Sequence, residues 1–527
     1  MSEKANSERG DRNVEWTTEA PDIEGMAQQK EMAGDTHSPN LTDWKFVMVI
    51  VGFGMAFVGS QVQPLMFAAI TPLVSASFNA SNLLIWFFTT QIVSCGVISP
   101  FAGPLADNFG RKRITLAGIA SSMIAMIVCA STPTSGGYIA GQVLAGVGIA
   151  VQELMAIAAI TEIVPTKYRG YYTAMVVTAF LPFAPASLYG ELISKTNWRY
   201  AACMIAIWNF LTFIIILLFY RPPARPNSMG LTWFQKFKKI DFLGGFLMTC
   251  GTVFFLVGFN WGGQAHPWNS PQVIAFLTIG LASGVFFFLY EIFLAPHPMF
   301  PRRLLRHPQT FTALMLVILF SGINYVSILV FWVLEAVGIY NSDKQELAIS
   351  CMVAVDIHDI STVWAPLVLS LTAVGGVLIP NQLIMTIICP DDLIATGTCL
   401  TVCLRSIGQV IGKSVFYTQF VSVLTEKTTN DVVPVAIEAG IFDVSLLETM
   451  MPTLLETPWK TWILSVPALN ASDKVNMLHD AVIQAFAHAF ARVWYISIAF
   501  GVAAVIASIF IEDLTDLMDE HIAVNYF

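Results

Sequence analysis

Three ionisable side chains stand inside stretches of the sequence that are otherwise apolar. Glu153 lies in the run 137–160, and Arg405 and Lys413 lie in the run 394–421. A charge at the bilayer centre costs about 3 kcal/mol, so a carboxyl there should be neutral or paired, which suits Glu153 to carry a proton. A guanidinium keeps its proton, so Arg405 needs a carboxylate or an anionic substrate as its partner. Two alternatives stay open: Glu153 only bonds across a helix bundle, and Lys413 only extends to the outer membrane surface.

A short charged turn, GPLADNFGRKR, separates two further apolar runs at residues 103–113. Gly103 and Gly110 permit a tight turn, and Asp107 can stabilise the N-terminal end of a neighbouring helix or pair with an arginine. The basic residues Arg111 to Arg113 can anchor the turn to the membrane surface. A purely topogenic loop would explain the basic residues, but neither the aspartate nor the paired glycines.

The composition is that of a membrane protein. Of the 527 residues 55% are hydrophobic and only 12% are charged, with 38 Phe and 13 Trp, and the mean hydropathy is +0.66. A chain of this composition is expected to form a polytopic helical bundle. Its acidic N-terminal tail gives no reason to expect nucleic-acid binding. No histidine stands in a metal pair, and no motif predicts a cofactor, a metal site or a catalytic nucleophile.

Twelve apolar runs are long enough to cross about 30 Å of hydrocarbon. Because every backbone amide in lipid must be satisfied locally, we expect helices, and the fold class is an all-α polytopic membrane bundle. The runs cover residues 46–70, 83–102, 114–131, 137–160, 172–193, 201–220, 242–260, 272–295, 310–334, 363–388, 394–421 and 493–512.

Basic residues in the short connections predict the orientation. With the N-terminus in the cytoplasm, the short outer loops hold only Lys195, Arg199 and Lys344, whereas most other Lys and Arg fall in inner loops. Glycosylation sequons at Asn79 and Asn470 then lie outside the cell.

Several stretches together resemble a known transporter family. GPLADNFGRKR looks like the loop-two signature of the major facilitator superfamily, and EIVPTKYRG (162–170), NWRY (197–200), KKIDFLGG (238–245) and RSIGQVIG (405–412) extend the similarity along the chain. The chain is most similar to the fourteen-span fungal drug:proton antiporters, above all the trichothecene efflux pumps and siderophore transporters. This resemblance implies two pseudo-symmetric halves that alternate access to a central cavity.

The resemblance also implies roles for particular residues. Gly103, Asp107, Gly110, Arg111 and Arg113 match a conformational gate that is made in one state of the transport cycle and broken in the other. Glu153, Arg405, Gln142 and Lys413 remain for proton coupling or substrate contact.

The chain departs from the family pattern at three places. Asn108 stands where many members have arginine, and Gln142 replaces a buried arginine of proton-coupled members. Pro182 and Pro185 replace the glycine-rich pattern of many exporters.

The domain organisation follows from these assignments. We expect a disordered cytoplasmic tail at 1–45, a six-span bundle at 46–220, a linker with two extra spans at 221–308, a second bundle at 309–512 with an extracellular segment at 425–492, and a cytoplasmic tail at 513–527. The apolar run that starts at 347 stops at DIHDIS (356–361), too short to cross a membrane. A segment of roughly fifty residues, enough for two spans, would therefore be missing from the second half; the alternative is a true twelve-span carrier.

The expected function is proton-coupled export of an amphipathic toxin or secondary metabolite by a monomeric carrier, not an enzyme, in the plasma membrane. Vacuolar or vesicle membranes, import of a siderophore or other small molecule, and an inactive truncated carrier are the alternatives. GQVIGKS (408–414) lacks the glycine spacing of a phosphate-binding loop, which argues against ATP-driven transport.

Overall fold

The computed structural model describes residues 43–80, 83–183, 185–222, 241–263, 266–296, 298–326, 331, 377, 380–390, 393–438 and 472–514. They belong to one compact unit that runs from Asp43 to Tyr526. Within these residues the chain is helical, with a single isolated bridge between Gly262 and His266 and no strand. The all-α fold class is confirmed.

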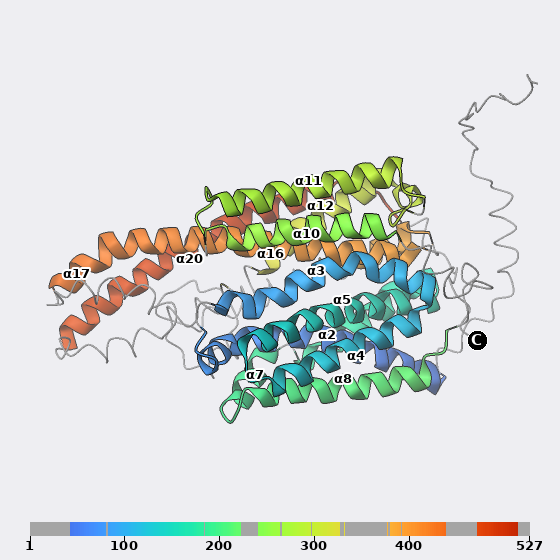
Figure 1. The fold of residues 1–527 in the computed structure, drawn as a ribbon, viewed down its shortest axis with the longest axis horizontal. Helices are drawn as coiled ribbons and strands as arrows, with labels where there is room; N and C mark the ends of the chain where they lie inside the picture. The colour runs from blue at the N-terminus through green and yellow to red at the C-terminus, as the bar shows by residue number, and fades with distance from the viewer. Residues whose placement is uncertain are drawn as a thin grey trace, which may run out of the picture. The chain divides into compact units, whose positions relative to one another are not determined.

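The first group of helices corresponds to the expected N-terminal bundle (Figure 1, blue to green). Its elements are α2 (Trp44–Ser77), α3 (Leu84–Phe109), α4 (Arg111–Ser131), α5 (Ser135–Ile163), the 3₁₀ turn Thr166–Tyr168, α6 (Arg169–Thr178), the 3₁₀ turn Leu181–Phe183, α7 (Ala186–Ser194) and α8 (Arg199–Phe219). Local chemistry starts two of these helices: the Asp43 carboxylate accepts from Lys45 N–H, and the Thr134 hydroxyl accepts from Gly137 N–H.

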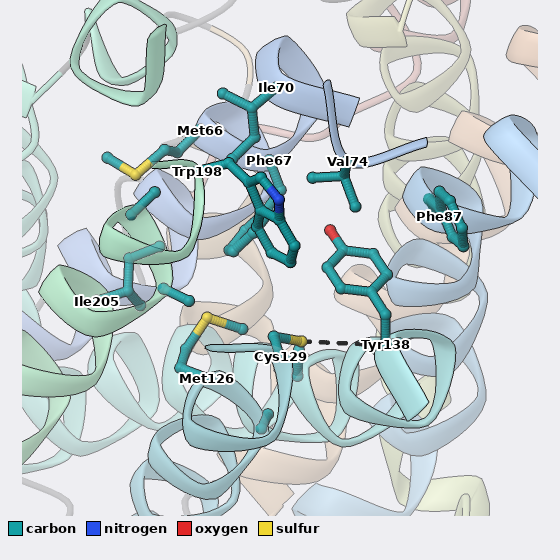
Figure 2. Packing of buried hydrophobic residues seen from close by; sticks show 14 of the residues in the cluster. Met66, Phe67, Ile70, Val74, Phe87, Met126, Cys129, Tyr138, Trp198 and Ile205 are labelled. Atoms are coloured by element: carbon teal, nitrogen blue, oxygen red, sulfur yellow. Dashed lines mark hydrogen bonds between the residues drawn. The ribbon is translucent and has the colours of Figure 1, made fainter. Parts of the chain in front are cut away.

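An aromatic cluster packs this first group of helices together. Tyr138 of α5 is fully buried and meets the rings of Phe87 and Trp198 edge-on, at centroid distances of 5.1 and 5.8 Å. Figure 2 shows these residues with Met66, Phe67 and Cys129, so that α2, α3, α4, α5 and the start of α8 share one core. Edge-to-face aromatic contacts of Tyr138 thus link α5 to α2, to α3 and to the start of α8.

The second group contains the linker helices and the C-terminal helices (Figure 1, green to red). Its elements are α10 (Phe242–Trp261), α11 (Pro271–Phe293), the 3₁₀ turn Arg302–Leu305, α12 (Pro308–Val326), α16 (Ile394–Lys427), the π-helical turn Thr428–Val432, α17 (Val433–Glu438) and α20 (Ser472–Ser508). The side chains of Asp241 and Ser270 cap the linker pair, and Pro271 occupies the first helical position of α11. Helices α10 and α11 pack on each other, and α12 packs on α16 and α20.

The two groups meet along a seam formed chiefly by α3 and α16. Helix α10 lies against both of these helices, and α5 also contacts α16. We call the ends of the helices that the charge distribution places in the cytoplasm the inner ends, and the opposite ends the outer ends. The Gly110 turn, at φ 93°, lies at the inner end, and α3 begins at the outer end.

Eight helices in the described part of the chain are long and apolar enough to cross a membrane. They cover Trp44–Thr71, Arg111–Ser131, Ser135–Ile163, Arg199–Phe219, Phe242–Trp261, Pro271–Phe293, Ile394–Glu438 and Asp480–Ser508. These agree with eight of the twelve expected runs, while α3 and α12 occupy two others. Most of the run 363–388, and with it residues 352–359, lies outside the described residues.

Two elements differ from the expectation. The run 172–193 is not one helix, because α6 ends at Thr178 and α7 starts at Ala186, with Pro182 and Pro185 between them. Each proline removes an amide donor and obstructs the preceding turn. The last span also starts earlier than expected, since α20 begins at Ser472.

Helix α16 and its continuation are together longer than a bilayer is thick. The stretch Ile394–Glu438 contains 45 residues, about 67 Å of helix, whereas a bilayer with its headgroups measures about 45 Å. Its outer part packs against the first half of α20 through Phe420, Phe486 and Phe490. The segment 425–492, which the sequence predicts to be extracellular, therefore begins and ends in helix, and these two helical ends pack against each other.

Candidate functional site

Glu153 and Arg405 form an ion pair across the seam. The Arg405 Nη2 atom lies 2.6 Å from both Oε1 and Oε2 of Glu153. The Glu153 side chain is 3% exposed and that of Arg405 is 13% exposed. Because α5 carries the acid and α16 the base, the pair joins the two groups of helices at a buried position. A buried charge needs a partner of opposite charge, and each of these two residues has the other as its partner.

A small cavity surrounds this pair. It measures about 60 Å³, room for only a few water molecules at about 10–15 Å³ each. Helices α2, α3, α5, α12 and α16 all contribute to its wall, which is lined by Ser60, Gln61, Pro64, Leu65, Phe88, Gln91, Ile92, Cys95, Ile149, Glu153, Tyr325, Arg405, Ser406 and Gln409. The wall is amphipathic, and its one ion pair leaves it without net charge.

Other polar side chains within the apolar runs differ in their surroundings. Gln61, Gln91 and Tyr325 line the cavity. Gln63 is fully buried elsewhere and accepts a 3.5 Å hydrogen bond from Ser122, while Asn324 accepts one of 3.1 Å from Ser497. Helix-to-helix bonding accounts for these last two residues.

A second ionic cluster lies at the inner end of the seam. Arg111 forms an ion pair with Glu162 and lies 3.7 Å from Asp107. The other Asp107 oxygen accepts a 3.1 Å hydrogen bond from the hydroxyl of Thr396, in the first turn of α16. The carboxylate thus sits at the positive end of a helix of the opposite group. Arg113, in contrast, is exposed.

Gly103 brings the two backbones together beside this cluster. A Cβ atom at Gly103 would lie 2.6 Å from the carbonyl oxygen of Ala395 and 2.8 Å from the Cα of Thr396. Only glycine permits this approach of α3 to α16, so the spacing from Gly103 to Asp107 fits the contact with Thr396.

A third inner contact was not foreseen. Arg169, which begins α6, is 2% exposed and donates a 2.9 Å hydrogen bond from Nη1 to the carbonyl of Thr386. Gly170 beside it faces Leu383 at close range. The sequence signals were the stretch EIVPTKYRG, which carries both Arg169 and Glu162, but a single sequence does not show what an arginine in a loop will reach.

Lys413 differs from its expected placement. It does not extend to the membrane surface, since its side chain is only 8% exposed. Its Nζ donates to Thr89 Oγ1 of α3 at 2.5 Å and to Asn260 Oδ1 of α10 at 3.4 Å. The alternative that Lys413 only extends to the outer membrane surface is therefore wrong.

Gln142 lies away from the ion pair. Its Nε2 donates to the Cys129 thiol at 3.9 Å, and it precedes Glu153 by eleven residues of α5, about 16 Å of helix. The structure thus places Gln142 beside the aromatic cluster of Tyr138 and not at the cavity.

The remaining candidates are the two glycosylation sequons. Asn79 is exposed in the turn between α2 and α3, with φ 51°, whereas Asn470 lies outside the described residues. Within the described residues, no group of three or more metal-ligating side chains lies close together.

Comparisons with known proteins relate the chain to transporters. The family model "Fungal trichothecene efflux pump (TRI12)" matches residues 38–371 and 348–527. The chain is 23% identical over 570 aligned positions to a trichothecene efflux pump of Trichoderma arundinaceum, covering 95% of this chain and 92% of the relative. It is 26% identical to the MFS-type transporter ucsD of an Acremonium species over 54% of this chain and 48% of that protein. The chain thus spans about half the length of several curated relatives that it matches.

Solved structures resemble the chain more distantly. A bacterial homologue of the human lysosomal transporter Spinster, inward-facing and unoccupied, has a TM-score of 0.47 and 13% identity over 89% of this chain and 98% of that one. The proton:xylose symporter XylE has a TM-score of 0.43 and 10% identity over 92% and 98%.

Proposed function

Because the chain belongs to the fungal trichothecene efflux pump family, we propose that it is a multi-pass secondary carrier that exports an amphipathic toxin or secondary metabolite in exchange for protons. The names of relatives as efflux pumps support this direction. The membrane we propose is the plasma membrane, in which a monomer would suffice because the cavity lies within one chain. Asn79 is the described position that a glycan would occupy.

The observation that carries the proposal is the ion pair between Glu153 and Arg405. A buried carboxylate is stable as long as the guanidinium faces it, and it takes up a proton when the guanidinium moves away, because an unpaired charge in the membrane interior is expensive. Rocking of the two groups of helices about the seam changes the distance between α5 and α16. Proton binding and the conformation of the carrier are thereby coupled through one pair of side chains.

The cavity gives the second part of the mechanism. At about 60 Å³ it is too small for a multi-ring metabolite, so a substrate enters only when the halves separate at one end. Gln61, Gln91 and Tyr325 offer hydrogen bonds among apolar neighbours, which suits a molecule with both polar and apolar parts.

The inner cluster supplies a gate for this separation. The contacts of Asp107 with Thr396 and of Arg169 with Thr386, which lies in the helical stretch 380–388, both join the first group of helices to the second half of the chain at the inner side. We propose that Gly103, Asp107, Gly110 and Arg111 hold the inner side closed and that these contacts break when the cytoplasmic side opens. Arg113, which is exposed, would anchor the turn at the membrane surface.

Net flux under an imposed pH gradient tests the proposal. Sealed vesicles from expressing cells are loaded with a panel of amphipathic metabolites that includes a trichothecene, and net flux is followed before and after the gradient is collapsed. Export that stops on collapse supports proton antiport. Flux of the opposite sign would identify an importer, and flux that ignores the gradient would remove the coupling.

The Glu153→Gln variant tests the residue assignment in the same vesicles. We expect flux that no longer responds to the gradient, because an amide cannot exchange a proton. Glu426→Gln is the matched control, since it makes the same chemical change at an exposed residue of α16. Full coupling in Glu153→Gln would contradict the role of Glu153.

A further inference from the structure

Polar contacts gather at the outer end of the linker helix α10, where it meets the seam. Lys413 of α16 reaches both Thr89 of α3 and Asn260 of α10, at 2.5 and 3.4 Å. Its neighbour Ser414 donates to the backbone carbonyl of Phe259 and lies 3.5 Å from that of Gly262. One turn of α16 therefore makes hydrogen bonds both to α3 in the first group of helices and to the linker helix α10.

Apolar packing continues this three-helix contact toward the cavity. Val93 of α3, Leu256 of α10 and Val410 of α16 form one buried cluster. At the outer rim, Trp86 of α3 and Trp261 of α10 meet edge-on with their centroids 6.4 Å apart. The linker helix thus covers the outer part of the seam with both polar and apolar contacts.

The buried position of Lys413 makes its hydrogen bonds important. Its side chain is 8% exposed and that of Asn260 is 2% exposed, so water cannot readily replace either partner if the contact is lost. Lys413 follows Arg405 by eight residues of α16, about 12 Å toward the outer end. It lies between the ion pair at the cavity and the outer end of α16.

From these contacts we infer that the linker helix α10 is an outer clamp, which keeps α3 and α16 together through Lys413 and must release before the cavity opens to the outside. Lys413 is in this sense a positioning residue for transport. The inference rests on the proposed alternation of access, and it gives the linker helix α10 a role in the transport cycle. In this structure the contacts of the proposed inner gate and those of the outer clamp are both made.

Accessibility of the cavity from the outside tests the clamp without any substrate. Cys95 lines the cavity, and it is kept as the sole cysteine of the full-length chain. Intact cells are treated with a membrane-impermeant thiol reagent, and the labelling rate of Cys95 is measured. A result here is independent of whether the proposed substrate class and proton coupling are right.

We expect Lys413→Met and Asn260→Leu each to speed the labelling of Cys95 by roughly tenfold, the equilibrium shift that corresponds to the loss of about 1.4 kcal/mol of closed-state stabilisation. Thr89→Val should act in the same direction. The matched control is Lys427→Met, which removes a partly exposed lysine of the same helix that pairs with Asp431 outside the seam. It should leave the labelling rate unchanged.

Two results would overturn the inference. Unchanged labelling in Lys413→Met, in protein that reaches the cell surface at normal abundance, would show that this contact does not restrain the outer side. Faster labelling in Lys413→Met and Thr89→Val but not in Asn260→Leu would show that α3 and α16 close the outer end without the linker. Size-exclusion chromatography of each variant in detergent separates both results from misfolding.

Discussion

At the scale of single residues, the two members of the central ion pair are not equivalent. Removing Arg405 leaves Glu153 with a carboxyl group that can become neutral by taking up a proton. Removing the Glu153 carboxylate leaves a guanidinium that stays charged and buried. The cost of an unpaired buried charge therefore falls mainly on one of the two variants.

We expect Glu153→Gln to destabilise the folded protein by about 3–5 kcal/mol, the cost of breaking a buried pair on one side, and Arg405→Gln to destabilise it by clearly less. The double variant should be more stable than Glu153→Gln alone, because it leaves no unpaired charge. Thermal unfolding of purified protein in detergent, followed by tryptophan fluorescence, measures all three. Equal losses in both single variants would contradict this asymmetry.

Sequence reasoning identified the members of this pair but not the pair itself. Burial in an apolar run dictates that Arg405 and Glu153 each need a partner, since the cost of an isolated charge depends only on the local environment. Which partner each finds depends on the packing of helices separated by some 250 residues of sequence. The same limit applies to Lys413, whose neutral partners Thr89 and Asn260 carry no charge that a sequence pattern could match.

At the scale of secondary-structure elements, α3 and α16 approach each other closely at Gly103, in the proposed inner gate. Gly103→Ala would place a Cβ atom 2.6 Å from a backbone oxygen of Ala395, and backbone atoms cannot move aside without moving the helix. Overpacking of this kind costs about 1–3 kcal/mol. We expect the inner ends to separate and the hydrogen bond from Thr396 to Asp107 to weaken.

Cys399 reports this separation, because it is fully buried next to the contact and its thiol lies 3.6 Å from the carbonyl of Pro100. With Cys399 as the sole cysteine, labelling in inside-out vesicles should be faster in Gly103→Ala than in the parent chain. Gly284→Ala on α11 is the control, since a Cβ atom there meets nothing within 4 Å. Equal labelling of all three proteins would show that Gly103 does not keep the gate closed.

Helix positions followed from hydropathy, but helix continuity did not. The hydropathy of the sequence predicts α2, α4, α5, α8, α10 and α11, because each of these helices must present an apolar surface to lipid or to neighbouring helices. It does not register the break at Pro182 and Pro185, whereas α3 accommodates Pro100 and Pro104 without ending. Whether a proline ends a helix depends on whether its neighbours satisfy the freed carbonyls, which is a property of the packed bundle.

At the scale of the whole molecule, the chain has fewer residues than its alignment to the Trichoderma relative has positions. The alignment to the Trichoderma pump extends over 570 positions, more than the 527 residues of the chain, so the relative has residues that this chain lacks. The two matches to the family meet within residues 348–371. The stretch 352–359, where the sequence predicts a missing segment, falls inside this range.

The segment that the sequence predicts to be missing leads to a prediction about a longer chain. Inserting a segment of roughly fifty residues from the Trichoderma pump, enough for two spans, between Met352 and Asp359 should raise both the unfolding temperature and the gradient-driven flux. Two further helices would add van der Waals packing and interhelical hydrogen bonds to the second group of helices. The control is an insert of the same composition in scrambled order. Transcripts sequenced across these codons should also contain a longer form. A chain that transports as well without the insert, together with transcripts of the short form alone, would instead establish a carrier with fewer spans than its relatives.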